Sequence, residues 1–158
     1  MPLVIRSADD VLELDGRSIG TSAWHAVTQA EVDHFAEGTG NRAPIHIDPE
    51  FARQTPLGGT IAYGIQVLAM ATMLLSDLWD LQGVVDGVDY GANRVRYPAP
   101  VRVGQRVRLH ATVAKAQPSG ENGVRVSLDL VFELEGSERP ACVGEIVFIY
   151  FFDKAGAT

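Results

Sequence analysis

The apolar residues of this chain follow two different patterns, and the first is helical. Between residues 61 and 78, apolar side chains occupy nearly every face of a helix: Ile61, Ile65, Val67, Leu68, Met70, Met73, Leu74, Leu75 and Leu78. A helix that is hydrophobic all round is buried. The pattern therefore predicts one helix over residues 61–78 that is wholly enclosed by the rest of the fold.

The second pattern has a period of two and fills the C-terminal half. Residues 107–113 and 124–134 alternate between apolar and polar side chains, which is typical of half-buried strands. Two further strands are expected over residues 84–97, with a break near Gly87 or Gly91, and over residues 141–152. Four successive strands with short connections predict an antiparallel sheet.

The N-terminal half carries helix-start signals. Thr28 and Glu31 have the spacing of a capping box, in which each side chain satisfies an unpaired backbone N–H. Gly40 lies where that helix is expected to end. Asp48 precedes Pro49, which favours Asp48 as the N-cap of a second short helix with proline in its first turn.

Together these elements predict an α+β chain in which a curved antiparallel sheet wraps around one buried helix, the hot-dog arrangement. The length of 158 residues suits a single domain over residues 1–158. Such a sheet leaves an edge strand open, and an open edge favours pairing with a second copy. We therefore expect a homodimer.

Composition excludes several classes of protein. The net charge of −7 gives no electrostatic footprint for nucleic acid or an anionic membrane. The longest apolar segment is too short and too polar to span a bilayer, and the N-terminus does not resemble a secretory signal, so a cytoplasmic location is expected. The single cysteine, Cys142, lies in an apolar run and is interpreted as a packing residue. His25, His34 and His110 are scattered along the chain and show no metal-ligand spacing.

The candidate chemistry lies in the loop before the buried helix. His46 could act as an acid or base near neutral pH, or it could be a half-buried histidine that only hydrogen-bonds the backbone. We expect it to project from a short extended segment, because its neighbours Ile45 and Ile47 are apolar. Asn41 follows a glycine and is typical of a turn. Asp48 is better explained as an N-cap than as a partner carboxylate.

The start of the predicted buried helix offers a second candidate. Tyr63 and Gly64 lie there, where unpaired N–H groups and the positive end of the helix dipole are exposed. Gly64 would let a carbonyl oxygen approach those donors closely, as in an oxyanion hole. The alternative is a glycine needed for close packing, and the sequence leaves both open.

Several segments of the chain, taken in order, resemble one family. They are residues 27–36, 39–50, 58–64, 90–101, 103–104 and 139–143. They include the segments VTQAEVDHFA, TGNRAPIHIDPE and GGTIAYG. The chain resembles the MaoC-like (R)-specific enoyl-thioester hydratases and dehydratases, especially their nodulation-protein-N-like branch.

The resemblance implies an activity and roles for particular residues. Members of that family add water across the double bond of an enoyl thioester, or remove it, without a separate cofactor. Coenzyme A or phosphopantetheine belongs to the substrate, whose carrier is coenzyme A or an acyl-carrier protein. His46 matches the catalytic histidine and Gly64 the oxyanion-hole glycine. Asn93 and Arg94 match a family segment and are candidate substrate-binding residues, although such arginines are more often solvated surface charges.

Two positions depart from the family pattern. Asn41 stands where the family has a catalytic aspartate, and Tyr63 stands where it usually has a histidine. An amide cannot exchange a proton at physiological pH, and losing a general acid or base costs roughly a hundred- to ten-thousand-fold in rate. An introduced Asp→Asn change, natural divergence, or a catalytically inactive paralogue would each explain Asn41. The second departure, at Tyr63, favours natural divergence.

Three function classes follow. The first is a hydratase or dehydratase, with His46 as the acid–base group and the Gly64 N–H as the oxyanion donor. A naturally divergent site, with His46 as the only base and Tyr63 as a donor, could instead catalyse isomerisation, elimination or a Michael-type cyclisation. The second is a non-catalytic subunit that binds acyl thioesters or pairs with an active partner. The third, a hot-dog thioesterase, is disfavoured because residues 61–76 contain no Asp or Glu, whereas those enzymes carry a carboxylate on the central helix.

Overall fold

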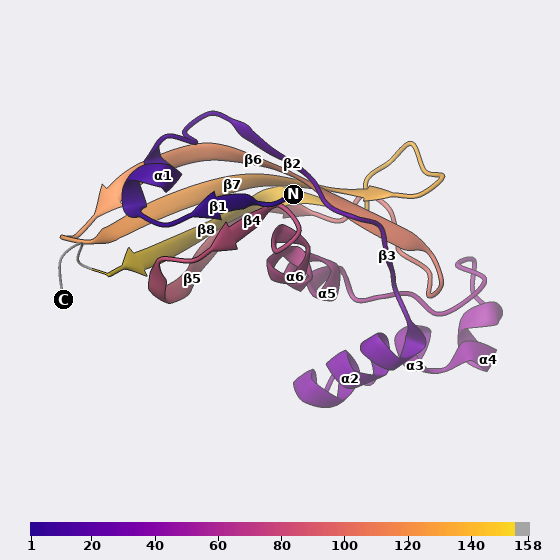
Figure 1. The fold of residues 1–158 in the computed structure, drawn as a ribbon. Helices are drawn as coiled ribbons and strands as arrows, with labels where there is room; N and C mark the ends of the chain where they lie inside the picture. Colours follow the sequence, from indigo (N-terminus) through magenta and orange to yellow (C-terminus); the bar gives the residue numbers. More distant parts are fainter. Residues whose placement is uncertain (154–158) are drawn as a thin grey trace.

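A computed structural model describes residues 1–153 of the chain (Figure 1). The strands are β1 (Leu3–Ile5), β2 (Ser18–Thr21), β3 (His25–Ala26), β4 (Trp79–Leu81), β5 (Val84–Arg96), β6 (Arg106–Ser119), β7 (Gly123–Leu134) and β8 (Cys142–Phe152). The helices are α1 (Ala8–Leu12), α2 (Gln29–Thr39), α3 (Pro44–Ile47), α4 (Pro49–Arg53), α5 (Gly64–Ala69) and α6 (Ala71–Leu75).

The main sheet is antiparallel and has the strand order β2-β6-β7-β8-β5, with β3 also paired to β6. The four predicted long strands are all present. Their order differs from their order in the sequence, because β5 pairs with β8 at the far edge and not with β6, which follows it. The short strands β1 to β4 had no clear signal in the sequence. Of these, β1 and β4 form a separate parallel pair.

The alternating residues predicted to face the core do so. Val107, Leu109 and Val113 on β6 are fully buried, as are Val124, Val126, Leu128 and Phe132 on β7. The sheet arches over α5 and α6, which lie in its concave face (Figure 1). The hot-dog arrangement expected from the sequence is therefore confirmed.

The central helix differs from its prediction in two ways. It begins at Gly64 and is divided at Met70 into α5 and α6, where the sequence predicted one helix over residues 61–78. It is also not buried on every face. Ile65 and Met73 are 55% and 45% exposed, while Val67 and Leu74 are buried. The sheet covers one side of the helix pair, and the apolar residues on its other side remain open in a single chain.

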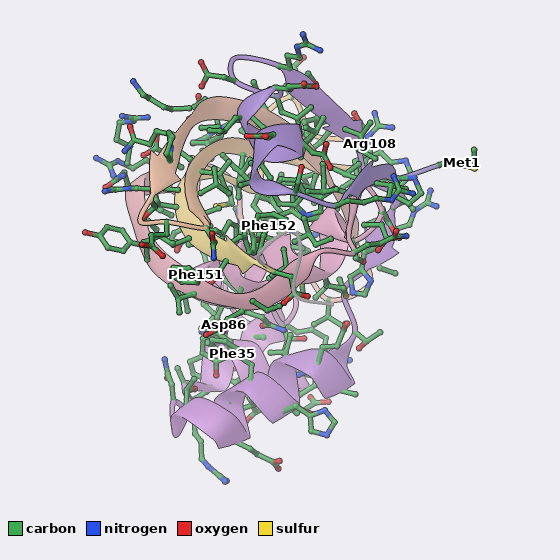
Figure 2. All side chains as sticks on the ribbon, turned by 60° about the vertical axis from the view of Figure 1, so that its left-hand side comes forward. Met1, Phe35, Asp86, Arg108, Phe151 and Phe152 are labelled. Carbon is green, nitrogen blue, oxygen red and sulfur yellow. The ribbon has the colours of Figure 1, made fainter. Side chains whose placement is uncertain are left out.

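The segment from α2 to α4 projects from the sheet as a separate arm, and both views show it below the body of the molecule (Figures 1 and 2). The predicted capping box of Thr28 and Glu31 begins α2, and Gly40, in the left-handed conformation, ends it. The carboxylate of Asp48 accepts hydrogen bonds from the N–H groups of Glu50 and Phe51, both at 3.0 Å. Asp48 is thus an N-cap, as expected.

Candidate active site

His46 lies on the one-turn helix α3, where the sequence predicted an extended segment. Pro44 in the first turn of α3 favours the helical conformation, because its ring fixes φ near the helical value. The Nδ1 atom of His46 lies 2.7 Å from the carbonyl oxygen of Ile61. A carbonyl can only accept, so Nδ1 carries the proton of this hydrogen bond. In the neutral ring, Nε2 is then the basic nitrogen.

His46 lines a cavity of about 230 Å³ together with Gly64. The cavity lies between the loop before α5, the start of α5 and the segment that follows β5. Its other lining residues are Ile61, Ala62, Val67, Tyr97, Ala99, Pro100, Val101 and Ala141. His46 and Tyr97 are the two members of this lining that can ionise, and the remaining walls are apolar apart from the backbone.

Gly64 is the first residue of α5, so its backbone N–H has no acceptor within the helix. A Cβ atom at this position would lie 2.7 Å from the ring of Tyr97, closer than two carbon atoms can approach. The glycine is therefore required for packing against Tyr97, and it is also one of the residues that line the cavity. The two interpretations of Gly64 left open by the sequence are compatible.

Tyr97 is the site residue that the sequence analysis missed. It falls inside the matched segment 90–101, directly before Pro98, yet nothing in the sequence indicates that its ring packs on the start of the central helix. Burial raises the pKa of the Tyr97 hydroxyl, with a smaller contribution from Cys142. The phenol is thus neutral at physiological pH and is a hydrogen-bond donor.

Tyr63 is buried against His46 and does not line the cavity. The rings of Tyr63 and His46 are stacked with their centroids 3.7 Å apart. The ring of Phe35, from α2, packs beside the tyrosine with its centroid 5.0 Å from that of Tyr63. In Figure 2, Phe35 lies where the arm meets the body of the molecule. The hydroxyl of Tyr63 donates to the backbone carbonyl of Asn41. This hydrogen bond and the ring stacking connect Tyr63 to both Asn41 and His46, and its role as a proton donor stays a prediction.

Asn41 is exposed, and its side-chain oxygen accepts a hydrogen bond of 3.3 Å from the N–H of Ala43. This is the local turn expected for an asparagine after a glycine. Asn41 is not among the residues that line the His46 cavity. The backbone of Asn41 is nevertheless tied to the site, because Tyr63 joins it to the His46 ring.

Asn93 and Arg94 lie on β5, away from the cavity. Asn93 donates to the carboxylate of Glu145, and Arg94 lies 3.4 Å from Glu145 and 3.7 Å from Asp129. Arg94 also has a φ of +53°, which is uncommon for a residue with a side chain. Within one chain the structure does not bring these two residues to His46, and their substrate-binding role stays a prediction.

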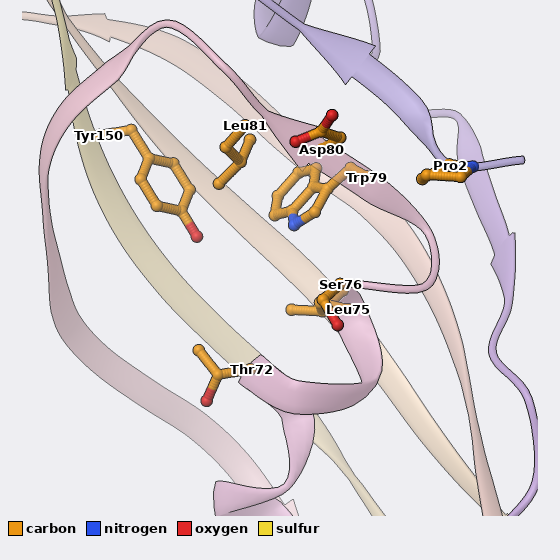
Figure 3. Close-up of a pocket in the computed structure, with 8 residues that line it drawn as sticks. All are labelled: Pro2, Thr72, Leu75, Ser76, Trp79, Asp80, Leu81 and Tyr150. Carbon is orange, nitrogen blue, oxygen red and sulfur yellow. The ribbon is translucent and has the colours of Figure 1, made fainter.

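A second cavity, of about 340 Å³, lies at the other end of the helix pair (Figure 3). Thr72 and Leu75 of α6, Trp79 of β4 and Tyr150 of β8 form its walls, and the hydroxyl of Tyr150 points into the space between Trp79 and Thr72. Burial raises the pKa of this hydroxyl strongly, and the nearby Asp89 adds to the effect. Thr72 also borders an open apolar groove against β5 and β8.

Two further findings concern the expectations drawn from composition. Cys142 is buried, and burial raises the pKa of its thiol to about 11, as expected of a packing residue. Among residues 1–153, no three His, Cys, Asp or Glu side chains cluster as metal ligands, and no helix is long and apolar enough to cross a membrane.

A sheet curved around a central helix defines a hot-dog protein, and His46 and the first residue of that helix, Gly64, line one of its cavities. Comparison with known proteins gives the family. The model of the MaoC-like domain matches residues 11–131, and the chain belongs to that family.

Individual relatives agree with this assignment. The chain is 40% identical to 3-hydroxyacyl-thioester dehydratase Z of Mycobacterium tuberculosis over 91% of this chain and 95% of that protein. It is 34% identical to nodulation protein N of Rhizobium leguminosarum, over 93% and 92% respectively. The crystal structure of a MaoC-like dehydratase from Rhodospirillum rubrum superposes with a TM-score of 0.69 at 25% identity, covering 89% of this chain and 94% of that one. These relatives support the expected hydro-lyase class.

Proposed function

We propose that this protein is a hydratase or dehydratase that interconverts an enoyl thioester and a 3-hydroxyacyl thioester. One observation carries the proposal: His46, with Nδ1 bound to the Ile61 carbonyl, shares a cavity with Gly64, the first residue of α5, whose N–H has no acceptor within the helix. A base and an oxyanion donor in an apolar cavity are what removal of a proton next to a thioester requires. The relative from Mycobacterium tuberculosis, a 3-hydroxyacyl-thioester dehydratase, supports the same substrate class.

In the dehydration direction, Nε2 of His46 removes the α-proton of the 3-hydroxyacyl thioester. Negative charge grows on the thioester oxygen, and the N–H of Gly64 stabilises it. The C–O bond at the 3-position then breaks, and the departing hydroxyl needs a proton to leave as water. We assign this proton to the Tyr97 hydroxyl, which regains it from the imidazolium of His46, so the enzyme ends unchanged. Hydration is the reverse.

The role of Asn41 follows from this assignment. In the family pattern a carboxylate stands at position 41, and an amide there cannot transfer a proton. A second ionisable side chain in the cavity, Tyr97, supplies what the amide lacks. The change at position 41 is then natural divergence, and the same pair of groups would also serve an isomerisation, an elimination or a Michael-type cyclisation.

The acyl chain is proposed to extend toward the second cavity. Two hollows lie along the α5–α6 pair: the groove bordered by Ile65, Leu68 and Thr72, and the cavity of Figure 3. Thr72 lines both of them. Their walls are mostly apolar, which suits hydrocarbon. No separate cofactor is required in this scheme, because coenzyme A or phosphopantetheine arrives as part of the substrate.

We also propose a single domain over residues 1–158 and a homodimer that forms through β5. This edge strand is exposed along most of its length and carries Val85, Val88 and Tyr90 at 45–58% exposure. Ile65 and Met73 add apolar surface on the uncovered side of the helix pair. Light scattering of the parent and of Val88→Lys tests this: a dimeric parent with a monomeric variant supports it, and a monomeric parent contradicts it.

The function is tested by a hydration assay on crotonyl-coenzyme A, which follows the loss of the enoyl absorbance. The parent, His46→Ala and a matched control, His34→Ala on the exposed face of α2, are compared. We expect the parent to turn over, His46→Ala to lose roughly a thousandfold in kcat, and His34→Ala to be unchanged. A parent that binds crotonyl-coenzyme A without any turnover would instead favour a non-catalytic subunit that binds acyl thioesters. The amide at position 41 is the observation that favours this alternative.

A further inference from the structure

The side chain of Gln29, in the first turn of α2, lies at the back of the His46 loop. Its amide nitrogen donates to the backbone carbonyl of His46 and to the carboxylate of Asp33, both at 2.8 Å. Its oxygen accepts from the hydroxyl of Thr60 at 2.6 Å. The carbonyl and the carboxylate can only accept, so the orientation of the amide is fixed by its partners.

Thr60 connects this amide to the other element that holds His46. It is 7% exposed and directly precedes Ile61, whose carbonyl accepts the Nδ1 proton of His46. The backbones of the two loops also meet directly, because the N–H of Ile61 donates to the carbonyl of Ile45 at 3.3 Å. His46 is therefore held at its main chain through Gln29 and at its ring through Ile61.

We propose that Gln29 and Thr60 form a clamp that positions His46 for proton transfer. The inference rests on the proposed role of His46 and adds residues that the mechanism above does not use. The clamp fixes the distance between the backbone of His46, which Gln29 holds, and the Ile61 carbonyl, which holds the His46 ring. With both anchored, Nδ1 keeps its proton and Nε2 stays the basic atom.

The expected effect of breaking the clamp is on geometry more than on binding. Neither Gln29 nor Thr60 lines the cavity, so neither is expected to touch the substrate. A displacement of about 1 Å at a catalytic group costs up to roughly a hundredfold in rate. Loss of the clamp should therefore lower kcat and leave KM nearly unchanged.

The test uses two pairs of variants in the whole chain. Gln29→Met keeps the length of the side chain and removes all three hydrogen bonds, and Gln117→Met on the exposed part of β6 is its control. Thr60→Val keeps the shape and removes the hydroxyl, and Thr60→Ser restores it. For Gln29→Met and Thr60→Val we expect kcat on crotonyl-coenzyme A to fall about ten- to a hundredfold with KM within about threefold. Thr60→Ser and Gln117→Met should match the parent.

A second readout does not depend on activity. Nitrogen-15 NMR of the imidazole reports which ring nitrogen carries the proton. We expect the parent His46 to be protonated at Nδ1, and the clamp variants to show a mixture with Nε2. Unchanged kcat and an unchanged tautomer in both Gln29→Met and Thr60→Val would overturn the proposal that these residues position His46. A loss of kcat matched by an equal loss of folded protein would overturn it as well.

The two proposals can fail separately. If the parent shows no turnover that depends on His46, the proposed function fails, and the NMR comparison alone decides the clamp. An unperturbed tautomer in the folded clamp variants then overturns it, and a perturbed one supports it.

Discussion

The two cavities at opposite ends of the α5–α6 pair differ in their chemistry, although both contain a tyrosine with a raised pKa. At the Gly64 end, Tyr97 shares its cavity with His46 and with a helix N–H. At the Trp79 end, the cavity of Tyr150 has mostly apolar walls (Figure 3). Its polar lining residues are Thr72, Ser76 and Asp80, and the lining contains no histidine. A phenol becomes useful in proton transfer only beside a base that can return its proton. The presence of His46 beside Tyr97 supports the proposed placement of the chemistry at the first cavity and of the acyl chain at the second.

The sharpest test of this contrast removes each hydroxyl in turn. Tyr97→Phe keeps the ring packed on Gly64 and should lower kcat for crotonyl-coenzyme A about a hundredfold, because a general acid is lost. Tyr150→Phe is the matched control and should stay within about twofold of the parent at neutral pH. Steady-state kinetics of both variants decide the matter. Equal activities for Tyr97→Phe and the parent would remove Tyr97 from the mechanism.

Restoring the carboxylate in the His46 loop should have a smaller effect. Asn41→Asp is expected to raise the hydration rate about tenfold, less than the roughly hundred- to ten-thousandfold that a general acid–base group contributes, because residue 41 does not line the cavity. The same change combined with Tyr97→Phe should recover part of the lost rate. A rate that does not rise in either background would exclude the family mechanism at position 41.

A larger side chain at the exposed Thr72 should narrow the space proposed for the acyl chain. Thr72→Phe introduces a ring where the groove and the Figure 3 cavity meet, and Thr72→Ser is the control that adds no volume. We expect kcat/KM for enoyl thioesters of eight or more carbons to fall about tenfold, since a few lost methylene contacts cost 1–3 kcal/mol. Crotonyl-coenzyme A should be unaffected. A uniform loss across chain lengths would place the acyl chain elsewhere.

The smallest expected effect concerns stability at alkaline pH. The pKa of Tyr150 is raised in the folded state, so the unfolded chain ionises first. Its contribution to the free energy of unfolding is then full below the ordinary tyrosine pKa of about 10 and declines as pH rises above it. One group gives a slope of at most about 1.4 kcal/mol per pH unit. Urea unfolding of the parent between pH 9 and 11 should show this decline, and Tyr150→Phe should lessen it. Parallel curves for the two proteins would contradict it.

Much of the fold could be predicted because its signals are local. The capping box at Thr28, the N-cap at Asp48 and the period of two along β6 and β7 each depend on neighbouring residues, and each is present in the structure. The pairing of β5 with β8 could not be predicted, because any of the four strands can occupy an edge as far as its own sequence is concerned.

The candidate site shows the same division. The likeness of residues 39–50 to a known motif singled out His46 and Asn41, and the helix-start signal singled out Gly64. The sequence did not show that Tyr63 is stacked on His46 and hydrogen-bonded to Asn41. Nor did it show that Tyr97, which is 51 positions after His46 in the chain, lines the same cavity. Contacts of this range depend on how the sheet curves.

The sequence by itself determined the long strands, the helix starts at Thr28 and Asp48, the class of fold and the family, because periodicity, caps and motifs are properties of adjacent residues. Only the tertiary structure decided which nitrogen of His46 is basic, which hydroxyl shares its cavity and which face of the central helix stays open. Each of these depends on a hydrogen bond or a contact between segments that folding brings together. The geometry of the candidate site is therefore a property of the packed chain, although the residue types that form it are present in the sequence.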